Sequence, residues 1–191
     1  MRRIGITGGI GSGKSVVSRL LRIMGYSVYD TDSEAKRLME SSLEVVQKLS
    51  ECFGRDIYHN GRLNRRLLSS RVFGKSDKIV LLNSIVHPVV RFDFYRWSES
   101  LNEEICFVES AILYESRFDE LVDEVWTVTA PEELRISRVR QRSGLTEEEI
   151  KKRMAAQLSE EEKQRRAAHI IWNDGNVSVI HRVLSLLKSL E

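Results

Sequence analysis

The sequence predicts an α/β fold built on one five-stranded parallel sheet. Short apolar runs that suit strands buried on both faces alternate with amphipathic stretches that suit helices. A glycine-rich loop joins the first predicted strand to the first predicted helix. A chain of 191 residues with 41% hydrophobic content can bury a core of this kind, so we expect one domain with insertions.

The N-terminal elements follow from changes in the hydrophobic period. We expect a strand over Arg3–Thr7, a helix over Lys14–Met24 that ends at Gly25, and a strand over Tyr26–Tyr29. The stretch from about residue 33 to 101 is predicted to be helical. Its helices are expected at Leu43–Phe53, at Arg65–Phe73 after a turn at Asn60-Gly61, and at Asp77–Val86, ending before His87-Pro88.

The C-terminal half returns to strands and helices in alternation. Strands are expected at Ile105–Glu109, Glu124–Thr129 and His169–Asn173. Pro131 suits the first turn of a helix that reaches about Arg142. Two capping boxes follow, Thr146 with Glu149 and Ser159 with Glu162, and a last helix over about Val177–Leu190 carries Ile180, Val183, Leu184 and Leu187 on one stripe. Trp97, Trp126 and Trp172 are most simply core residues.

The overall charge excludes several classes of partner. The chain has 30 basic and 28 acidic residues, so we expect neither a nucleic-acid nor a membrane partner. No apolar stretch approaches the roughly 20 residues that span a bilayer.

Cys52 and Cys106 are isolated and the first residues read as a strand rather than a signal peptide, so a cytoplasmic protein is expected. We expect a monomer or a small homo-oligomer that acts on a small-molecule substrate.

The segment from Gly8 to Ser15 fits the phosphate-loop pattern G-x-x-x-x-G-K-[ST]. Glycines let backbone N–H groups converge on phosphate oxygens, Lys14 can reach the β- and γ-phosphates, and the Ser15 hydroxyl can ligate Mg²⁺. The pattern therefore predicts binding of ATP and Mg²⁺, against the plainer alternative of a tight turn without a ligand. The nucleotide-binding residues expected here are Gly8, Gly9, Gly11, Ser12, Gly13, Lys14, Ser15 and Val16.

Two carboxylates follow the second predicted strand. Open α/β sheets bind ligands at the carboxyl ends of their strands, so Asp30 and Asp32 are expected near a second pocket. Asp32 could accept a proton from a hydroxyl nucleophile, or it could cap the helix that starts at Ser33. Asp30 could instead support Mg²⁺.

The segment from Glu132 to Arg166 is a candidate lid. Arg138 and Arg142 lie one helical turn apart, so both guanidinium groups can face the transferring phosphoryl group. A solvated helix whose arginines pair with glutamates is the alternative, and it is preferred for Arg135, Arg140, Arg165 and Arg166.

The residues alone leave the fate of the phosphate open. The chain lacks the guanine-reading N-K-x-D pattern of a GTPase switch. A second pocket and a cationic lid favour a small-molecule kinase. A kinase for another nucleotide or nucleoside, and a binding protein without catalysis, are the alternatives.

Several segments in order resemble the dephospho-CoA kinase family, whose enzymes phosphorylate the ribose 3′-hydroxyl of dephospho-CoA to make coenzyme A. The segments are "GITGGIGSGKS", "DTD", "NGRLNRRLLSSRVF", "LNSIVHPVVR", "SAILYE", "RVRQR" with "RMAAQ", and "NDG". The resemblance covers nearly the whole chain. It implies a three-layer P-loop kinase fold whose sheet has the strand order Tyr26, Ile105, Arg3, Glu124, Ile170.

The resemblance also implies roles for single residues and boundaries for domains. Asp32 would be the catalytic base, Lys14 and Arg138 would act on the phosphates with Arg142 close by, and Asn173 and Gly175 would border the adenine of ATP. Arg65 and His87 would lie in the acceptor domain and contact the substrate, although His87 could instead be a buried helix-ending residue. Gln157 would be a lid or substrate contact. The core would comprise 1–32, 102–131 and 167–191, the acceptor domain 33–101 and the lid 132–166.

The chain departs from the family pattern at four positions. Asn60 and Asn64 replace aspartates, Glu109 takes the place of an acid that is usually aspartate, and Ala111 replaces a proline. The change at Ala111 removes a rigid turn just after a strand that is expected to line the acceptor site.

Overall fold

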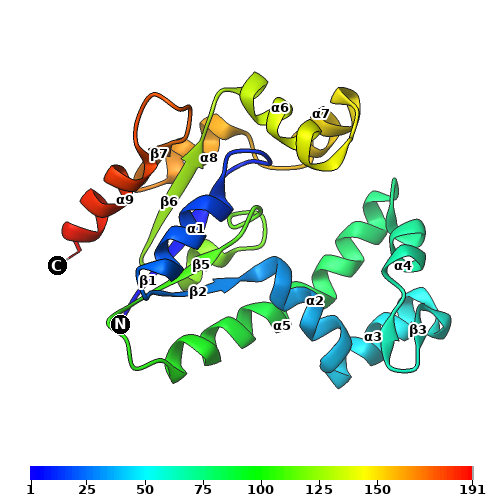
Figure 1. Ribbon diagram of the computed structural model, residues 1–191. Coiled ribbons are helices and arrows are strands. Elements are labelled where there is room, and N and C mark those ends of the chain that lie inside the picture. Colours follow the sequence, from blue (N-terminus) through cyan, green and yellow to red (C-terminus); the bar gives the residue numbers. More distant parts are fainter. Residues whose placement is uncertain (191) are drawn as a thin grey trace. The chain divides into compact units, whose positions relative to one another are not determined.

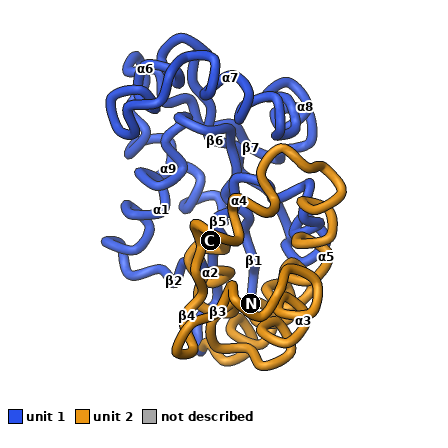
Figure 2. Tube along the Cα trace, turned by 90° about the vertical axis from the view of Figure 1, so that its right-hand side faces the viewer, with its two compact units in different colours: residues 1–29, 102–191 blue, residues 30–101 orange. Residues whose placement is uncertain are grey.

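A computed structural model describes residues 1–190 of the chain (Figure 1). The chain forms two compact units, one of residues 1–29 with the chain from Asn102 onward, the other of Asp30–Leu101 (Figure 2). The segment expected to be the lid belongs to the first unit. The expected helical insertion corresponds closely in sequence to the second unit.

The first unit is built on a five-stranded sheet with the order β2-β5-β1-β6-β7. The register is parallel, with Ile4 opposite Phe107 of β5 and opposite Glu124 of β6. The α/β fold and the strand order expected from the sequence are confirmed. The strands are β1 (Arg2–Thr7), β2 (Ser27–Asp30), β5 (Ile105–Glu109), β6 (Glu124–Thr129) and β7 (His169–Trp172).

Two helices, α1 (Lys14–Ile23) and α9 (Val179–Lys188), pack on the strands in one apolar core. Because side chains alternate along a strand, Ile4 and Ile6 reach this core while Gly5 lies against Leu113 on the other side of β1. The remaining buried members are Val17 and Leu21 of α1, Phe107, Trp126, Val128 and Ile171 of the strands, and Val183, Leu186 and Leu187 of α9.

The buried face of α9 differs from the predicted stripe. Val183 and Leu187 are buried as expected, but Ile180 is 54% exposed and Leu184 is 37% exposed, since the helix is rotated so that Leu186 points inward. Trp172 is also 45% exposed, which corrects its assignment to the core, because β7 lies at the edge of the sheet.

The expected lid segment contains α6 (Glu132–Ser143), α7 (Glu147–Ala155) and α8 (Glu160–Arg166). Helix α7 begins with the complete capping box of Thr146 and Glu149. Helix α8 has only half of the predicted box: the Ser159 hydroxyl accepts from the Glu162 N–H, while the Glu162 carboxylate pairs with Arg165. Helices α6 and α7 pack through a small apolar cluster of their own, described with the site below.

The second unit contains four helices among its described elements. They are α2 (Thr31–Ser41), α3 (Leu43–Phe53), α4 (Arg65–Val72) and α5 (Ser76–Ser100). A short helix η1 (Arg55–Ile57) leads into the hairpin of β3 (Tyr58–His59) and β4 (Arg62–Leu63), whose turn lies at the predicted Asn60-Gly61 pair. Another short helix, η2 (Phe118–Leu121), belongs to the first unit.

Helix α5 continues through Pro88, so the predicted helix end before His87-Pro88 is wrong. Proline removes one helical hydrogen bond and disfavours helix in the residue before it. These costs are local, whereas burial of Val86, Val90 and Phe94 along the same helix continues past the proline and offsets them.

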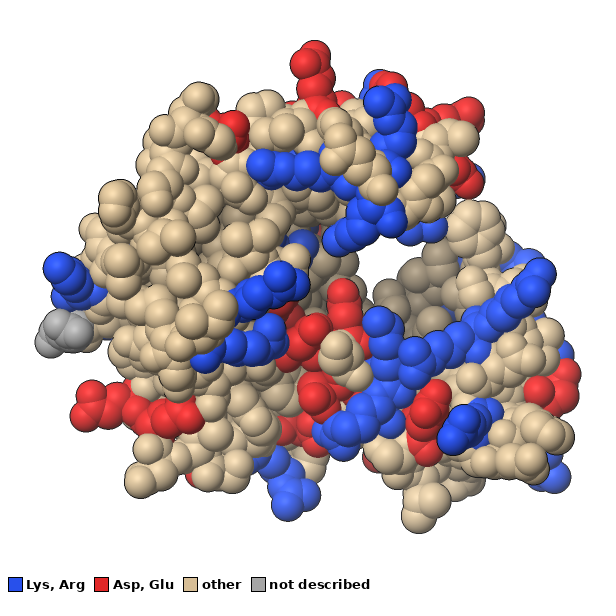
Figure 3. Space-filling view, in the orientation of Figure 1, with Lys and Arg blue, Asp and Glu red and all other residues tan. Residues whose placement is uncertain are grey.

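The surface charge is mixed. On the face shown in Figure 3, Lys and Arg side chains lie among Asp and Glu side chains. This mixture agrees with the balanced composition of the sequence. Cys52 and Cys106 are free thiols. Within residues 1–190, no helix combines the length and apolar character needed to cross a membrane.

Candidate active site

The phosphate loop joins β1 to α1 with glycine at the positions that need it. Gly8 has φ 145° and Gly13 has φ 98°, values that residues other than glycine rarely adopt. A Cβ on Gly8 would overlap the Val128 carbonyl, and one on Gly13 would overlap the Asn173 amide. The loop therefore keeps its shape only with these glycines.

The predicted nucleotide-binding residues lie together in this loop and the first turn of α1. Gly13 is the N-cap of α1, and Lys14, Ser15 and Val16 open the helix, so their N–H groups lie at its positive end. The buried Ser12 hydroxyl has no hydrogen-bond partner among the described residues. A buried unpaired hydroxyl beside a helix N-terminus fits a site that binds phosphate.

Asn173 is held beside this loop from the end of β7. Its Nδ2 donates to the Ser12 carbonyl over 2.9 Å, and its backbone N–H donates to the Thr129 carbonyl over 2.8 Å. Gly175 lies two residues further on, exposed and with φ 90°. The structure therefore brings Asn173 to the loop, while Gly175 has open space around it.

Helix α6 presents the predicted lid arginines. Arg138 is half-buried, and its buried Nη1 has no hydrogen-bond partner among the described residues. Arg142 lies in the last turn of the helix and is exposed. Burial of a guanidinium nitrogen without an acceptor costs free energy, and a bound anion would supply the missing acceptor.

The solvated-face interpretation is wrong for Arg135. This side chain is 7% exposed, its Nε donates to the Ala130 carbonyl over 3.1 Å, and its Nη1 lies 3.5 Å from Glu160 Oε1. The sequence spacing could not show this, because Arg135 faces inward only through the packing of α6 on the loop. Arg165 does pair with Glu162 at the surface, as expected.

Gln157 lies on the loop rather than at an open surface. Its Oε1 accepts from the Ile10 N–H over 3.0 Å, and its Nε2 donates to the Ala111 carbonyl over 3.5 Å. Both ends of this amide, expected from the resemblance to be a lid or substrate contact, therefore form hydrogen bonds with backbone groups. Ala111, which departs from the family pattern, takes part through its carbonyl alone.

The helix cap after β2 is Asp30 and not Asp32. The Asp30 carboxylate accepts from the N–H groups of Asp32 and Ser33 at 3.0 and 3.2 Å, and from the Ser33 hydroxyl at 2.9 Å. The capping alternative for Asp32 is thus wrong, since Asp30 fills the role. Asp32 lies in the first turn of α2 and is exposed.

Arg65 and His87 both belong to the second unit. Arg65 opens α4 and forms an ion pair with Glu40 at 3.2 Å. His87 is half-buried in the middle of α5, where burial, and secondly the nearby Arg91, lower the pKa of its imidazole. His87 is therefore not a helix-ending residue.

Sequence reasoning missed Glu160 and Lys163. Glu160 is one of three consecutive glutamates at the start of α8, where helix capping alone explains all three. Lys163 is fully buried, with its Nζ 2.8 Å from the Ala111 carbonyl, and burial lowers the pKa of its ammonium. The available signal was their spacing, because Glu160 and Lys163 are three residues apart in one helix and so lie on the same side of it.

The described residues hold no cluster of three or more His, Cys, Asp or Glu side chains suited to a metal ion. Magnesium commonly needs one or two protein ligands, with phosphate oxygens and water completing its shell. The exposed Ser15 hydroxyl at the start of α1 fits that limited protein contribution.

A parallel α/β sheet, a glycine loop at a helix N-terminus and an inward arginine on a neighbouring helix define a P-loop phosphotransferase. The sequence matches the dephospho-CoA kinase family model over residues 2–178. The chain belongs to the dephospho-CoA kinase family, which acts in coenzyme A biosynthesis.

Individual relatives agree with this family. The dephospho-CoA kinase of Bacteroides fragilis is 41% identical over 189 residues, covering 98% of this chain and 92% of that protein. That of Porphyromonas gingivalis is 40% identical over 191 residues, covering 100% and 95%. The crystal structure of TT1252 from Thermus thermophilus matches with a TM-score of 0.86 at 37% identity, covering 99% of this chain and 97% of that one.

Proposed function

We propose that this chain transfers the terminal phosphoryl group of ATP to the ribose 3′-hydroxyl of dephospho-CoA, giving coenzyme A and ADP. The observation that carries the proposal is the phosphate loop together with α6, which packs against Ile10 of the loop. This helix carries Arg138, whose buried Nη1 has no acceptor among the described residues. Membership of the dephospho-CoA kinase family identifies dephospho-CoA as the molecule that accepts the phosphoryl group. The reaction places negative charge on the transferring group, and a buried guanidinium nitrogen without an acceptor, on a helix that packs against the loop, suits that charge.

The loop and the lid bind the phosphoryl donor, ATP. The loop N–H groups and Lys14 bind the β- and γ-phosphates, and Arg138, with Arg142 further along α6, stabilises the transferring group. Ser15 would contribute a ligand to Mg²⁺, which neutralises phosphate charge when bound. Asn173 and Gly175 border the adenine.

The acceptor side falls to Asp32 and the second unit. Asp32 accepts the proton of the ribose hydroxyl. This role is supported by the cap of α2, which is formed by Asp30, so that the Asp32 carboxylate is not needed to cap the helix. Arg65 and His87 contribute to the acceptor domain, proposed as 33–101, and the segment 132–166 acts as the lid that excludes water. The two isolated free thiols fit a reducing compartment, so we place the reaction in the cytoplasm.

The test uses purified protein, MgATP and a panel of acceptors that includes dephospho-CoA, nucleosides and nucleotides, read by mass spectrometry. We expect coenzyme A and ADP to form in equal amounts. Phosphorylation of a nucleoside without coenzyme A formation would contradict the proposal in favour of another kinase. Release of unchanged ATP with every acceptor would favour a binding protein without catalysis.

A further inference from the structure

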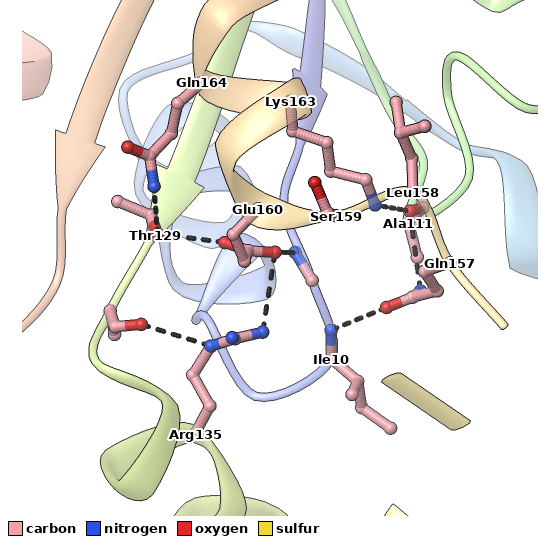
Figure 4. Close-up of polar contacts among 12 residues, drawn as sticks. Ile10, Ala111, Thr129, Arg135, Gln157, Leu158, Ser159, Glu160, Lys163 and Gln164 are labelled. Carbon is pink, nitrogen blue, oxygen red and sulfur yellow. Dashed lines mark hydrogen bonds and ion pairs between the residues drawn. The ribbon is translucent and has the colours of Figure 1, made fainter. Parts of the chain in front are cut away.

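Two side chains, Gln157 between α7 and α8 and Glu160 at the start of α8, bind the backbone of the phosphate loop (Figure 4). The Gly9 N–H donates to Glu160 Oε1 over 2.8 Å, and the Ile10 N–H donates to Gln157 Oε1 over 3.0 Å. Two consecutive N–H groups of the loop are therefore bound by protein oxygens. The N–H groups of Gly9 and Ile10 therefore both point toward the segment that carries Gln157 and Glu160.

The Glu160 carboxylate is held on several sides. Its Oε2 accepts from the Thr129 hydroxyl over 2.9 Å, and that hydroxyl accepts from Gln164 Nε2 over 3.2 Å. Arg135 Nη1 lies 3.5 Å from Glu160 Oε1, and the two side chains are 7% and 12% exposed. A charged acceptor with this many partners and little water makes strong, directed hydrogen bonds. Glu160 is therefore a rigid support for Gly9.

The support is fixed to the sheet as well as to the loop. Gln157 Nε2 and Lys163 Nζ both donate to the Ala111 carbonyl, in the turn that follows β5. The Thr127 hydroxyl of β6 donates to the Lys163 carbonyl over 3.3 Å. The segment that carries the acceptors is thus anchored to strand β6 and to the turn that follows β5.

The tip of the loop also contacts the lid helices through a side chain. Ile10 packs against the apolar cluster of Ile136, Val139 and Ile150, which joins α6 to α7. Arg135 belongs to the same helix as Arg138, one turn earlier. The contacts at Gly9 and Ile10 therefore connect the loop to α6, the helix that carries Arg138.

We propose that Gln157 and Glu160 are positioning residues that set the conformation of the phosphate loop, and that Glu160 with Arg135 fixes the loop relative to α6. Neither side chain contacts substrate in this proposal. Its connection to phosphoryl transfer rests on the proposed function, but its effect on nucleotide affinity does not. Loss of either acceptor leaves a loop N–H unsatisfied and weakens ATP binding without changing the affinity for dephospho-CoA.

The main test compares Glu160→Ala with Glu160→Gln. Alanine removes the acceptor of the Gly9 N–H, so we expect the Kd for ATP to rise at least about fivefold. Glutamine keeps an amide oxygen in place, so its Kd should stay within about threefold, while its Tm falls because buried Arg135 loses its counter-charge. Glu162→Gln is the matched control, since it removes a carboxylate from the same helical turn at the surface.

Amide hydrogen exchange gives a readout that is independent of activity. Protection of the Gly9 amide should fall in Glu160→Ala and persist in Glu160→Gln. A folded Glu160→Ala protein that keeps both Gly9 protection and wild-type affinity for ATP would overturn the proposal. So would equal losses of ATP affinity in the alanine and glutamine variants, because retention of the amide oxygen would then have no effect.

Gln157→Ala tests the same idea if Glu160→Ala does not fold, because it removes no charge. We expect faster exchange at the Ile10 amide, a rise in the Kd for ATP and an unchanged KM for dephospho-CoA. A raised KM for dephospho-CoA with unchanged ATP affinity would return Gln157 to the substrate and contradict the proposal. If the wild-type protein makes no coenzyme A, the proposed function fails, while Kd and amide exchange still decide the role of these residues.

Discussion

At the scale of single residues, the two aspartates after β2 have separate tasks. Asp30 caps α2 through Oδ1, which accepts from two backbone N–H groups, and its Oδ2 accepts from the Ser33 hydroxyl, while Asp32 is exposed in the first turn of that helix. The sequence spacing left Asp32 open as a cap or as a base. The structure removes the first option, because a single cap satisfies the Asp32 and Ser33 N–H groups.

Replacement of Asp32 by asparagine is expected to separate chemistry from folding. The proposed base is lost, so kcat should fall about 10²–10⁴-fold, while the Kd for ATP and the Tm change little. Asp30→Ala is the contrasting variant, because loss of the cap should cost about 0.5–2 kcal/mol of stability. Steady-state kinetics and thermal unfolding measure both effects. Near-normal turnover in Asp32→Asn would remove Asp32 from the chemistry.

Replacement of Arg138 by alanine is expected to act on the transition state. Its buried Nη1 has no hydrogen-bond partner among the described residues and could bind the transferring group, so we expect kcat to fall about 10²–10³-fold with the Kd for ATP changed less than about threefold. Arg140→Ala, an exposed arginine on the same helix, serves as the control. A change in Tm alone would contradict the role proposed for Arg138.

At the scale of elements, the local pattern predicted most helices and strands but not the course of α5. Helix α3 has its predicted bounds because Ser42 caps it and Gly54 ends it, both by contacts within one turn. The break predicted at His87-Pro88 fails because the buried side of α5 continues to Phe94. A local conformational penalty is therefore outweighed by burial along a long helix.

Pro88→Ala is expected to stabilise the protein. Alanine restores a helical N–H that can donate to the carbonyl of Ser84, so the free energy of unfolding should rise by about 1–2 kcal/mol. The matched control is Pro131→Ala before α6, where no helical N–H is needed and the more flexible unfolded chain should lower stability by about 0.4–1 kcal/mol. Urea unfolding measures both. Effects of the same sign would contradict this account of α5.

At the scale of the whole molecule, buried weak acids make stability depend on alkaline pH. Burial, and secondly Glu40, raises the pKa of Tyr58 from 10.0 to about 12. Burial likewise raises the pKa of Tyr114 to about 12 and that of the Cys106 thiol to about 11. The folded state favours their neutral forms, so their stabilisation is complete below the unfolded-state pKa values and is lost as pH rises toward the folded-state values.

Stability should therefore fall between about pH 9 and pH 12, and Tyr58→Phe should reduce that fall because phenylalanine does not ionise. Denaturant unfolding at pH 9 and pH 11 measures the difference for each variant. Tyr95→Phe, at a tyrosine that is 47% exposed, is the control. An equal loss of stability in wild type and Tyr58→Phe would show that Tyr58 does not contribute to the alkaline transition.

Features that depend on residues close together in the sequence were predictable, whereas features that depend on distant residues were not. The phosphate loop, the strand β5 and the cap of α7 depend on neighbouring residues, whose backbone preferences and hydrophobic period can be read directly. The loop motif thus predicts a nucleotide site from local sequence alone. The supports of that loop could not be read in this way.

Glu160 meets the Gly9 N–H across a separation of 151 residues, and Gln157 meets that of Ile10 across 147. In the sequence, nothing separates Glu160 from Glu161 beside it, and nothing separates Arg135 from Arg140 on the same helix. Which of them turns inward depends on how α6 and α8 pack against β6 and the loop. The motif itself arises from local chemistry, whereas the side chains that hold it in shape are selected by tertiary packing, because only packing brings distant residues within hydrogen-bond reach and excludes water from them.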